Sequence, residues 1–218
     1  GAFRVLTKWP LTQRGLQYDR EWMIVTANGV CLTQKTETRM CMITPTIDIA
    51  AGWLELRFPY TEAVLVPLDI VERERNVLAS LCQSKVCGDR IEGIDCGDAV
   101  AKWLSDVLCT SDLRLIRQSS TDTRRFKSSK DTTQAISLAN QAQFLLINEA
   151  SVGWLLNKVV DWCGQPEAEQ VRLSNAIDRF RGNLIVDAPD VLSETGWAEV
   201  EIGRVRLRAS GPCTRCQM

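Results

Sequence analysis

Short apolar runs separated by turn-forming residues dominate the first part of the chain. Apolar runs at 21–25 and 30–34 flank Asn28-Gly29, and an Asn-Gly pair between apolar runs is a strong signal for a tight β-hairpin. Three further apolar runs follow, at 42–49, 53–58 and 63–68. Their spacing predicts a small antiparallel meander or barrel, so that residues 1 to about 70 form a β-rich unit.

Two later segments carry apolar residues at helical spacing. From Asp98 onward these residues recur every three or four positions, and carboxylates stand at the start, where the helix dipole favours negative charge. This pattern predicts a helix over about 98–109. A similar pattern predicts a second helix over about 149–162, with Gly164 just beyond its end.

The remaining apolar runs predict strands. They lie at 113–117, 144–147 and 181–187, and then at 198–202 and 204–209, which flank Gly203 as a hairpin would. Residues 118–135 are rich in Ser, Thr, Asp and basic residues without an apolar period, which predicts a mobile surface loop. Many short strands and two helices indicate a β-rich α+β fold rather than a doubly wound sheet.

Composition and charge exclude several classes of function. The 218 residues hold 26 basic and 27 acidic side chains, so the net charge of -1 gives no global positive field for nucleic acid or an anionic membrane. Histidine is absent from the sequence, which excludes Ser-His-Asp triads, Cys-His dyads and His-ligated zinc or iron. No apolar stretch reaches the roughly 18 residues of a membrane span. The nine scattered cysteines indicate reduced thiols and a cytoplasmic location.

A cluster of positive charge marks the C-terminal end, where no acidic residue lies between Ile202 and Met218. The cluster comprises Arg204, Arg206, Arg208 and Arg215, beside the motif Cys213-Thr214-Arg215-Cys216. Cationic neighbours stabilise a thiolate, which is both a nucleophile and a soft metal ligand. Three arginines at alternating positions are equally typical of the solvated face of an edge strand, so both interpretations stay open on spacing alone.

Three motifs carry a family resemblance, and they are Gly15-Leu16-Gln17-Tyr18-Asp19-Arg20-Glu21-Trp22, Phe180-Arg181-Gly182-Asn183 and Gly211-Pro212-Cys213-Thr214-Arg215-Cys216-Gln217-Met218. Together with supporting segments at 28–32, 95–98 and 140–148, they resemble a MOSC domain with its N-terminal β-barrel partner. Within that family the chain is similar to the C-terminal part of molybdenum cofactor sulfurases. The resemblance implies a β-barrel-like domain over 1–75 and a MOSC domain over 76–218, truncated at both ends.

The resemblance also implies a site for the molybdenum cofactor, an anionic molybdopterin that carries an oxo-molybdenum centre. Cys216 matches the cysteine that ligates molybdenum in the family, and it is the expected catalytic residue. The other expected cofactor-binding residues are Arg20, Asn140, Arg181, Asn183, Thr214 and Arg215.

Several of these residues have a plain structural alternative. Arg20, between Asp19 and Glu21, could be a surface ion-pair residue, Asn140 could form an Asx-turn, and Asn183 could end a strand. Cys213 is expected to be a small buried residue rather than a second reactive thiol.

The activity implied for the whole protein is sulfur transfer. A persulfide made by an N-terminal pyridoxal-phosphate desulfurase domain of the same chain would replace an oxo ligand of the cofactor, which would activate xanthine dehydrogenase and aldehyde oxidase. The desulfurase domain is absent from this sequence, so we expect this fragment to bind the cofactor without turning over, with no nucleic-acid or membrane partner. Two alternatives stay open: an amidoxime-reducing MOSC oxidoreductase and a cofactor carrier without chemistry.

Overall fold

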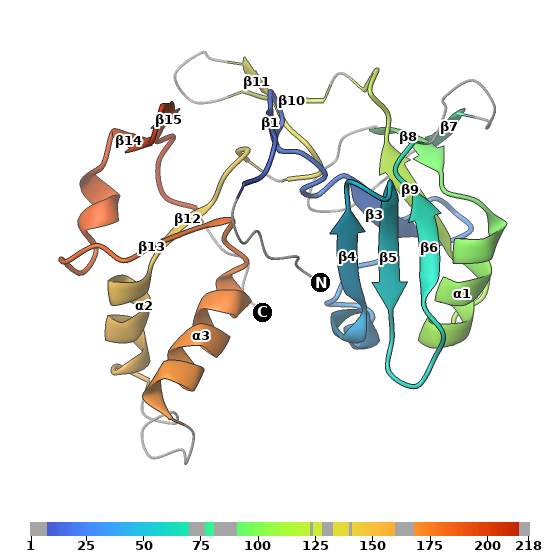
Figure 1. Cartoon of the computed structure of the whole chain (residues 1–218), viewed down its shortest axis with the longest axis horizontal. Coiled ribbons are helices and arrows are strands. Elements are labelled where there is room, and N and C mark those ends of the chain that lie inside the picture. Colours follow the sequence, from blue (N-terminus) through green and yellow to red (C-terminus); the bar gives the residue numbers. More distant parts are fainter. Residues whose placement is uncertain are drawn as a thin grey trace. The chain divides into compact units, whose positions relative to one another are not determined.

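The computed structural model describes residues 8–69, 77–80, 91–122, 124–127, 133–139, 141–159 and 168–213. The contacts within the chain divide it into two compact units, the first from Gly1 to Asn140 and the second from Gln141 to Gln217. The described part holds many short strands and three α-helices, which confirms a β-rich α+β fold. Figure 1 gives the element labels used below, and each unit is described by itself.

The first sheet of unit 1 is the predicted antiparallel meander. It consists of β4 (Thr44–Asp48), β5 (Trp53–Arg57) and β6 (Val64–Pro67), paired in the order β4-β5-β6 (Figure 1). Alternate residues of β5 and β6 point to the core, where Leu54 and Val66 are buried. The apolar runs therefore located this sheet correctly.

The second sheet of unit 1 has the strand order β3-β9-β8-β7. Its strands are β3 (Trp22–Val25), β9 (Arg114–Gln118), β8 (Ile91–Asp95) and β7 (Val77–Ser80). The predicted helix is α1 (Asp98–Leu108), which contacts β6 and β9. The fully buried Leu104 and Leu108 of α1 join Leu54 and Leu115 in one core cluster.

The predicted hairpin of 21–25 with 30–34 forms only in part. The chain turns at Gly29, whose φ is 72°, and Val25 makes one isolated bridge to Cys31. On its other edge β3 pairs with β9 along its whole length. Met23, Ile24 and Val25 are all buried, whereas Val30 in the second arm of the hairpin is 44% exposed.

The prediction of a mobile surface loop over 118–135 is wrong for the described residues of that segment, whereas 123 and 128–132 lie outside them. Within it, β10 (Arg125–Lys127) pairs with β11 (Thr133–Ala135) in an antiparallel hairpin. Gln118, Ser119, Asp122 and Arg124 are all less than 9% exposed. These polar side chains are buried because they hydrogen-bond to one another and to backbone carbonyl groups, a pattern that leaves no hydrophobic period to detect. Two shorter strands, β1 (Leu11–Thr12) and β2 (Gly15–Leu16), also pair in this unit.

Unit 2 contains a parallel strand pair with two helices between its strands in sequence. The predicted strand near 144–147 is β12 (Leu146–Asn148), and it pairs with β13 (Leu184–Val186). The helices are α2 (Glu149–Leu156) and α3 (Glu169–Phe180), which pack on each other through Val152, Ala176 and Ile177 (Figure 1).

The helix α3 was not predicted, and β13 begins later than expected because residues 181–183 form the turn that follows that helix. The helix α2 ends at Leu156, and Gly164, expected at its end, lies outside the described residues.

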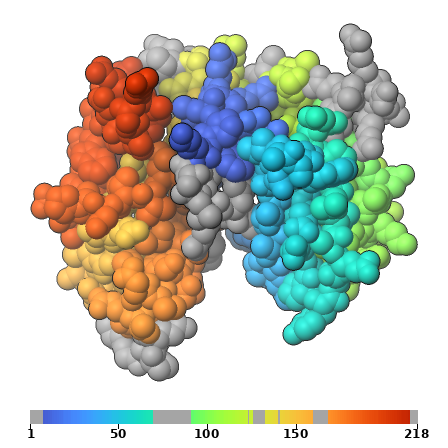
Figure 2. Space-filling model, in the orientation of Figure 1, coloured from blue at the N-terminus to red at the C-terminus, as the bar shows by residue number. Residues whose placement is uncertain are grey.

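The predicted C-terminal hairpin is present as β14 (Glu199–Ile202) and β15 (Val205–Arg208), joined through Gly203 with a φ of 60°. Glu199 stands opposite Arg208 and Glu201 opposite Arg206, so each strand places its charges on the same face. The hairpin, coloured red, lies open at the surface in Figure 2.

The division between the two units falls at Asn140, and α1 belongs to unit 1. The boundary predicted from the sequence, between 1–75 and 76–218, differs from this division and stays a prediction for the domains. No helix in the described ranges is long and apolar enough to cross a membrane.

Candidate functional site

The first motif, Tyr18 to Trp22, forms a turn that leads into β3. Within this turn Tyr18 has a φ of 66° and Arg20 a φ of 55°, so both residues adopt the left-handed conformation. A left-handed conformation of a residue other than glycine costs about 1–3 kcal/mol and persists only where the surroundings hold it. The neighbouring contacts must therefore fix this turn.

The guanidinium of Arg117, on β9, is at the centre of those contacts. Its Nε and Nη2 donate to Oε2 of Glu21 over 3.2 and 3.0 Å, and its Nη1 donates to the carbonyl oxygen of Leu68. The guanidinium carbon lies 5.3 Å from the ring centroid of Tyr18 and 5.1 Å from that of Trp22, within range of cation–π attraction. Three residues of the motif thus enclose one arginine.

The carboxylate of Glu21 connects the backbone of this turn to Arg117. Its Oε1 accepts a 2.8 Å hydrogen bond from the backbone N–H of Tyr18, while its other carboxylate oxygen holds Arg117. The ion pair is largely shielded, with 18% of the Arg117 side chain and 20% of the Glu21 side chain exposed. The motif therefore uses Tyr18, Glu21 and Trp22 to build a backbone that carries Arg20.

Arg20 lies at the accessible side of this turn. Its Nη1 pairs with the carboxylate of Asp19, which is the ion pair that the structural alternative predicted, and 28% of its side chain is exposed. Its backbone carbonyl accepts a 2.9 Å hydrogen bond from the N–H of Leu138. Arg20 is thus a partly exposed ion-pair residue on a backbone that other residues hold, and its contact with the cofactor stays a prediction.

The second motif, Phe180 to Asn183, forms the turn between α3 and β13 in unit 2. Arg181 caps the helix in the left-handed conformation, with a φ of 58°, and its N–H donates to the carbonyl of Asp178. At Gly182 a Cβ atom would lie 2.4 Å from Cγ1 of Ile147 and 3.2 Å from the carbonyl oxygen of Leu145. Only glycine fits between this turn and the chain at β12. The Arg181 side chain itself is exposed.

Asn183 ties the same turn to the chain before β12. Its Oδ1 accepts a 2.6 Å hydrogen bond from the N–H of Leu145, and its Nδ2 donates to the carbonyl of Gln143 over 3.1 Å. This arrangement is the strand-ending role considered as the alternative for Asn183. It fixes the two segments that flank the turn of Arg181.

Comparisons with known families match both parts of the chain. Residues 2–111 match the MOSC N-terminal beta barrel domain, and residues 133–218 match the MOSC domain. The chain belongs to the MOSC family. This membership confirms the resemblance carried by the three motifs, two of which form the MOSC turns described above.

Related proteins extend the comparison over the whole chain. The chain is 49% identical over 218 residues to molybdenum cofactor sulfurase 3 of Aedes aegypti, covering 100% of this chain and 28% of that protein. It is 49% identical to molybdenum cofactor sulfurase of Bombyx mori, of which it covers 26%, and 40% identical to that of Bos taurus, of which it covers 25%, in each case over all of this chain. The chain thus spans about a quarter of the length of the curated relatives it matches.

One solved structure, a solution structure of a protein from Bordetella bronchiseptica, aligns with a TM-score of 0.39 and 18% identity over 50% of this chain and 85% of that one. This likeness is too distant to add to the description of the MOSC fold.

Four expected residues of the MOSC site, Asn140, Thr214, Arg215 and Cys216, lie outside the described residues, and their roles stay predictions. Cys213, expected to be buried, is exposed, because the chain after β15 runs along the surface. Arg206 is 77% exposed and its Nε lies 3.5 Å from Oε2 of Glu201, which fits the solvated edge-strand interpretation of the alternating arginines.

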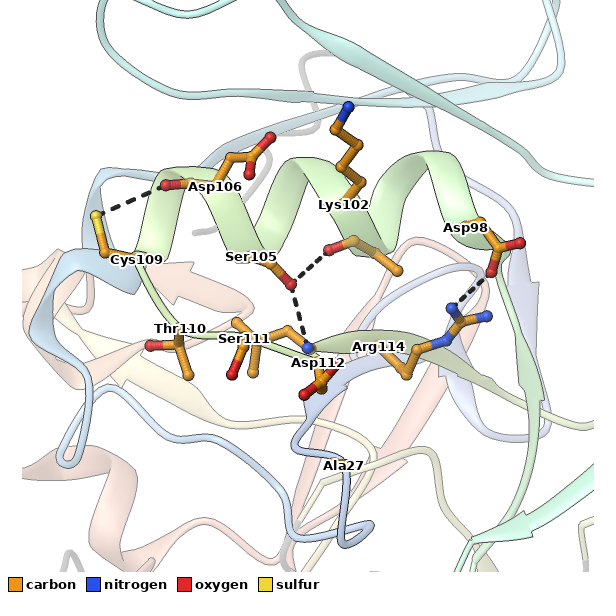
Figure 3. A pocket seen from close by; sticks show the side chains of 12 residues that line it. Ala27, Asp98, Lys102, Ser105, Asp106, Cys109, Thr110, Ser111, Asp112 and Arg114 are labelled. Carbon is orange, nitrogen blue, oxygen red and sulfur yellow. Dashed lines mark hydrogen bonds and ion pairs between the residues drawn. The ribbon is translucent and has the colours of Figure 1, made fainter.

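A groove of about 690 Å³ runs along α1, and none of the described expected site residues, Arg20, Arg181 and Asn183, lines it (Figure 3). Its polar groups contact one another: Arg114 Nη1 lies 2.7 Å from Oδ1 of Asp98, and Ser105 Oγ donates to the carbonyl of Ala101 and accepts from the N–H of Leu113. These polar groups of the groove are therefore paired with one another within unit 1.

A buried polar cluster at the start of α2 lies outside the three motifs. Asn148, 1% exposed, caps the helix by accepting from the N–H of Ala150, and its Nδ2 donates to Oε2 of Glu194 over 2.9 Å. Ser151 Oγ donates to the same oxygen over 2.9 Å.

Burial by itself would raise the pKa of Glu194, but the hydrogen bonds from Asn148 and Ser151, with one from the backbone, outweigh it and hold that pKa below its ordinary value. An Asn directly before Glu149 is an N-cap signal that could have located this cluster.

Proposed function

We propose that this chain is the molybdenum-cofactor-binding part of a molybdenum cofactor sulfurase. The observation that carries the proposal is the 49% identity, over the whole chain, to proteins of that name from Aedes aegypti and Bombyx mori. The matches to both MOSC domains support it. The geometry adds two arginines on fixed left-handed turns, Arg20 and Arg181.

The molybdenum cofactor is the substrate of the proposed sulfur transfer. The side chains expected at the site suit its chemistry. It is an anionic phosphorylated pterin, and guanidinium groups such as those of Arg20 and Arg181 bind such anions through charge-assisted hydrogen bonds. Thr214 and Arg215 add donors next to Cys216, and Asn140 and Asn183 add amides. A Cys216 thiolate is a soft ligand suited to the metal.

The second substrate is sulfur in the form of a persulfide. A pyridoxal-phosphate desulfurase domain in the rest of the longer protein would supply it. The outer sulfur of the persulfide would replace an oxo ligand of the bound cofactor, with a second thiol as the reductant. The oxygen would leave as water, and the cysteine that carried the persulfide would end in a disulfide with that thiol. The recipients of the product are enzymes of the xanthine dehydrogenase and aldehyde oxidase type, in the cytoplasm. This chain holds and orients the cofactor and does not make the persulfide.

Cofactor analysis of the full-length protein tests the proposal. Bound molybdopterin is measured by fluorescence after oxidation, and molybdenum by elemental analysis. We expect Cys216→Ala to keep the fold and to lose at least about nine-tenths of the molybdenum, because the metal loses its thiolate ligand. Molybdenum retained in full by this variant would refute Cys216 as the ligand.

The arginine of unit 2 is tested in the same way. Arg181→Ala should weaken cofactor binding by about 1.5–3 kcal/mol if the side chain makes a charge-assisted hydrogen bond. The matched control is Arg206→Ala, which removes an arginine that is 77% exposed on the β14–β15 hairpin and should leave cofactor content unchanged. Equal losses in the two variants would show a general effect of positive charge rather than a site at Arg181.

Addition of L-cysteine separates the proposal from its two alternatives. In a sulfurase the sulfido content of the bound cofactor rises after mixing with L-cysteine. An unchanged sulfido content would indicate a carrier. Reduction of an amidoxime with a haem-protein electron donor would indicate the oxidoreductase.

A further inference from the structure

We propose that Arg124 is a positioning residue, which fixes the backbone beneath Arg20 and thereby sets how tightly unit 1 holds its anionic ligand. This inference rests on the proposed function, in which Arg20 contacts the cofactor. It concerns a residue outside the three MOSC motifs, in the segment that the hydrophobic pattern assigned to a surface loop.

Arg124 is buried to an extent that is rare for an arginine. Only 7% of the residue is exposed, and a buried guanidinium is stable only where acceptors compensate its desolvation. Its Nη1 donates to the carbonyl oxygen of Ser137 over 2.7 Å and to that of Ala139 over 2.6 Å. One guanidinium nitrogen therefore holds the two carbonyl groups on either side of Leu138.

Leu138 connects this segment to the turn that carries Arg20. Its N–H donates a 2.9 Å hydrogen bond to the carbonyl oxygen of Arg20. That carbonyl is part of the peptide bond that joins Arg20, a left-handed residue, to Glu21. The hydrogen bond therefore fixes the direction of the chain at Arg20. The contacts thus run from Arg124 through residues 137–139 to Arg20, all within unit 1.

Gln118 connects the same segment to the other end of the turn. Its backbone N–H donates to the carbonyl of Glu21 over 2.8 Å, and its Nε2 donates to the carbonyl of Ile136 and to Oδ2 of Asp122. The segment 136–139 is therefore tied to the carbonyl group of Arg20 directly and to that of Glu21 through Gln118, and Arg124 supplies two of its hydrogen bonds. In sequence the segment leads directly to Asn140, a second expected cofactor-binding residue.

A double-mutant cycle in the full-length protein tests whether Arg124 acts through Arg20. The variants are Arg20→Ala, Arg124→Met and the double variant, and the measurement is the apparent dissociation constant of molybdopterin, followed by its fluorescence after oxidation. We expect Arg124→Met to raise this constant about tenfold when Arg20 is present and less than about twofold when Arg20 is already Ala. Equal factors in the two backgrounds would show that Arg124 is only structural and would overturn the inference.

A milder variant keeps the test valid if Arg124→Met does not fold. Arg124→Lys retains the charge and up to three donors but lacks the planar fork, so we expect an intermediate rise that again disappears in the Arg20→Ala background. A rise of the same factor in both backgrounds would again contradict the inference.

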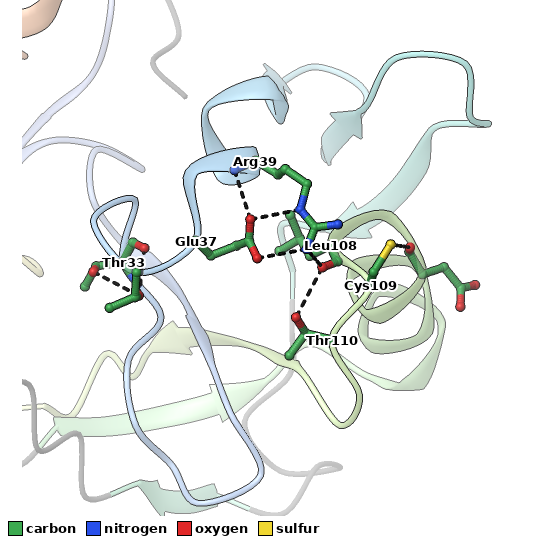
Figure 4. A network of polar contacts seen from close by, with 8 residues as sticks. Thr33, Glu37, Arg39, Leu108, Cys109 and Thr110 are labelled. Atoms are coloured by element: carbon green, nitrogen blue, oxygen red, sulfur yellow. Dashed lines mark hydrogen bonds and ion pairs between the residues drawn. The ribbon is translucent and has the colours of Figure 1, made fainter.

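Arg39→Met is the matched control. Arg39 also donates to a backbone carbonyl, that of Leu108 at the end of α1, and pairs with Glu37 over 2.9 Å (Figure 4). We expect its loss to lower stability while leaving the dissociation constant of the cofactor unchanged, and a comparable coupling of Arg39 to Arg20 would overturn the proposed path. Wild-type protein that retains no molybdopterin would refute the proposed function, and the inference with it. If the wild-type protein retains molybdopterin but the Arg124 and Arg20 substitutions act independently, only the inference is refuted.

Discussion

The turns that carry Arg20 and Arg181 reach the same backbone conformation by different means. Both arginines are left-handed, with φ values of 55° and 58°. In unit 1 the turn is held by an ion pair and two aromatic rings around Arg117, whereas in unit 2 it is held by the close packing of Gly182 and the neutral amide of Asn183. The left-handed conformation of an arginine therefore does not dictate how its turn is supported, and the two turns should fail under different changes.

The largest effect is expected from Arg117→Met, which removes the support of the first turn. It leaves the carboxylate of Glu21 shielded without its partner and abolishes both cation–π contacts, so we expect a loss of about 3 kcal/mol in the free energy of unfolding. Urea denaturation measures it.

The control is Arg57→Met, because Arg57 also forms a 2.9 Å ion pair, with Glu55, but its side chain is 65% exposed. That change should cost less than about 1 kcal/mol. Similar losses for the two variants would contradict the role of Arg117 at the turn.

Gly182→Ala tests the second turn by overfilling it. The added methyl would meet Cγ1 of Ile147 at 2.4 Å, so the turn or β12 must shift, at a cost of about 2 kcal/mol in unfolding free energy. Thermal unfolding followed by circular dichroism measures the change. Gly196→Ala is the control, since a Cβ atom there has nothing within 4 Å and should be tolerated. An unaltered melting temperature for Gly182→Ala would disprove the packing argument.

Asn183→Ala removes the amide that ties the second turn to residues 143–145. The N–H of Leu145 and the carbonyl of Gln143 each lose a partner, and we expect a loss of about 1–1.5 kcal/mol in urea denaturation. Because these bonds are neutral, added salt should change this loss little, whereas it should weaken the ionic support around Arg117. Asn175→Ala, on the exposed side of α3, is the matched control and should be neutral or slightly stabilising. A strong salt dependence of the Asn183 effect would break the contrast between the turns.

The smallest effect is expected from Glu194→Gln, which changes the carboxylate that accepts hydrogen bonds from Asn148 and Ser151 at the start of α2. The pKa of Glu194 is lowered in the folded protein, so its stabilising contribution is complete above the unfolded value of about 4.3 and is lost as the pH falls through the folded pKa. We expect the variant to be less stable by under about 1 kcal/mol at pH 7, since solvent partly screens the group. This difference should shrink below about pH 4 in unfolding curves recorded at several pH values. Curves that stay parallel from pH 7 to pH 3 would contradict it.

The sequence predicted the elements that a hydrophobic period marks. The meander, α1, β9 and the last hairpin each carry an apolar run or an apolar period, and each was located. The helix α3 was missed because its apolar inner face, formed by Leu173, Ala176, Ile177 and Phe180, stands among mostly polar residues. The segment around Arg124 was misjudged for a different reason, since polar side chains that are buried through hydrogen bonds look like surface residues in a hydropathy pattern.

The candidate site was predicted only at the level of its motifs. The resemblance selected Arg20, Arg181 and Asn183, but their supports lie far away in the sequence. Glu21 and Arg117 are 96 positions apart, and Leu145 and Asn183 are 38 apart. Contacts over such separations arise only when the sheets and helices pack, so the local spacing of residues cannot predict them.

The parallel pairing of β12 with β13 has a consequence for synthesis of the protein on the ribosome. A parallel pair needs a connection that crosses back over the sheet, and here that connection includes α2 and α3. Such non-local pairing forms late, after the intervening helices have docked. The nascent chain can therefore complete the turn of Arg181 only once Val186 has left the exit tunnel, whereas the meander of unit 1 can form while most of unit 2 is still untranslated.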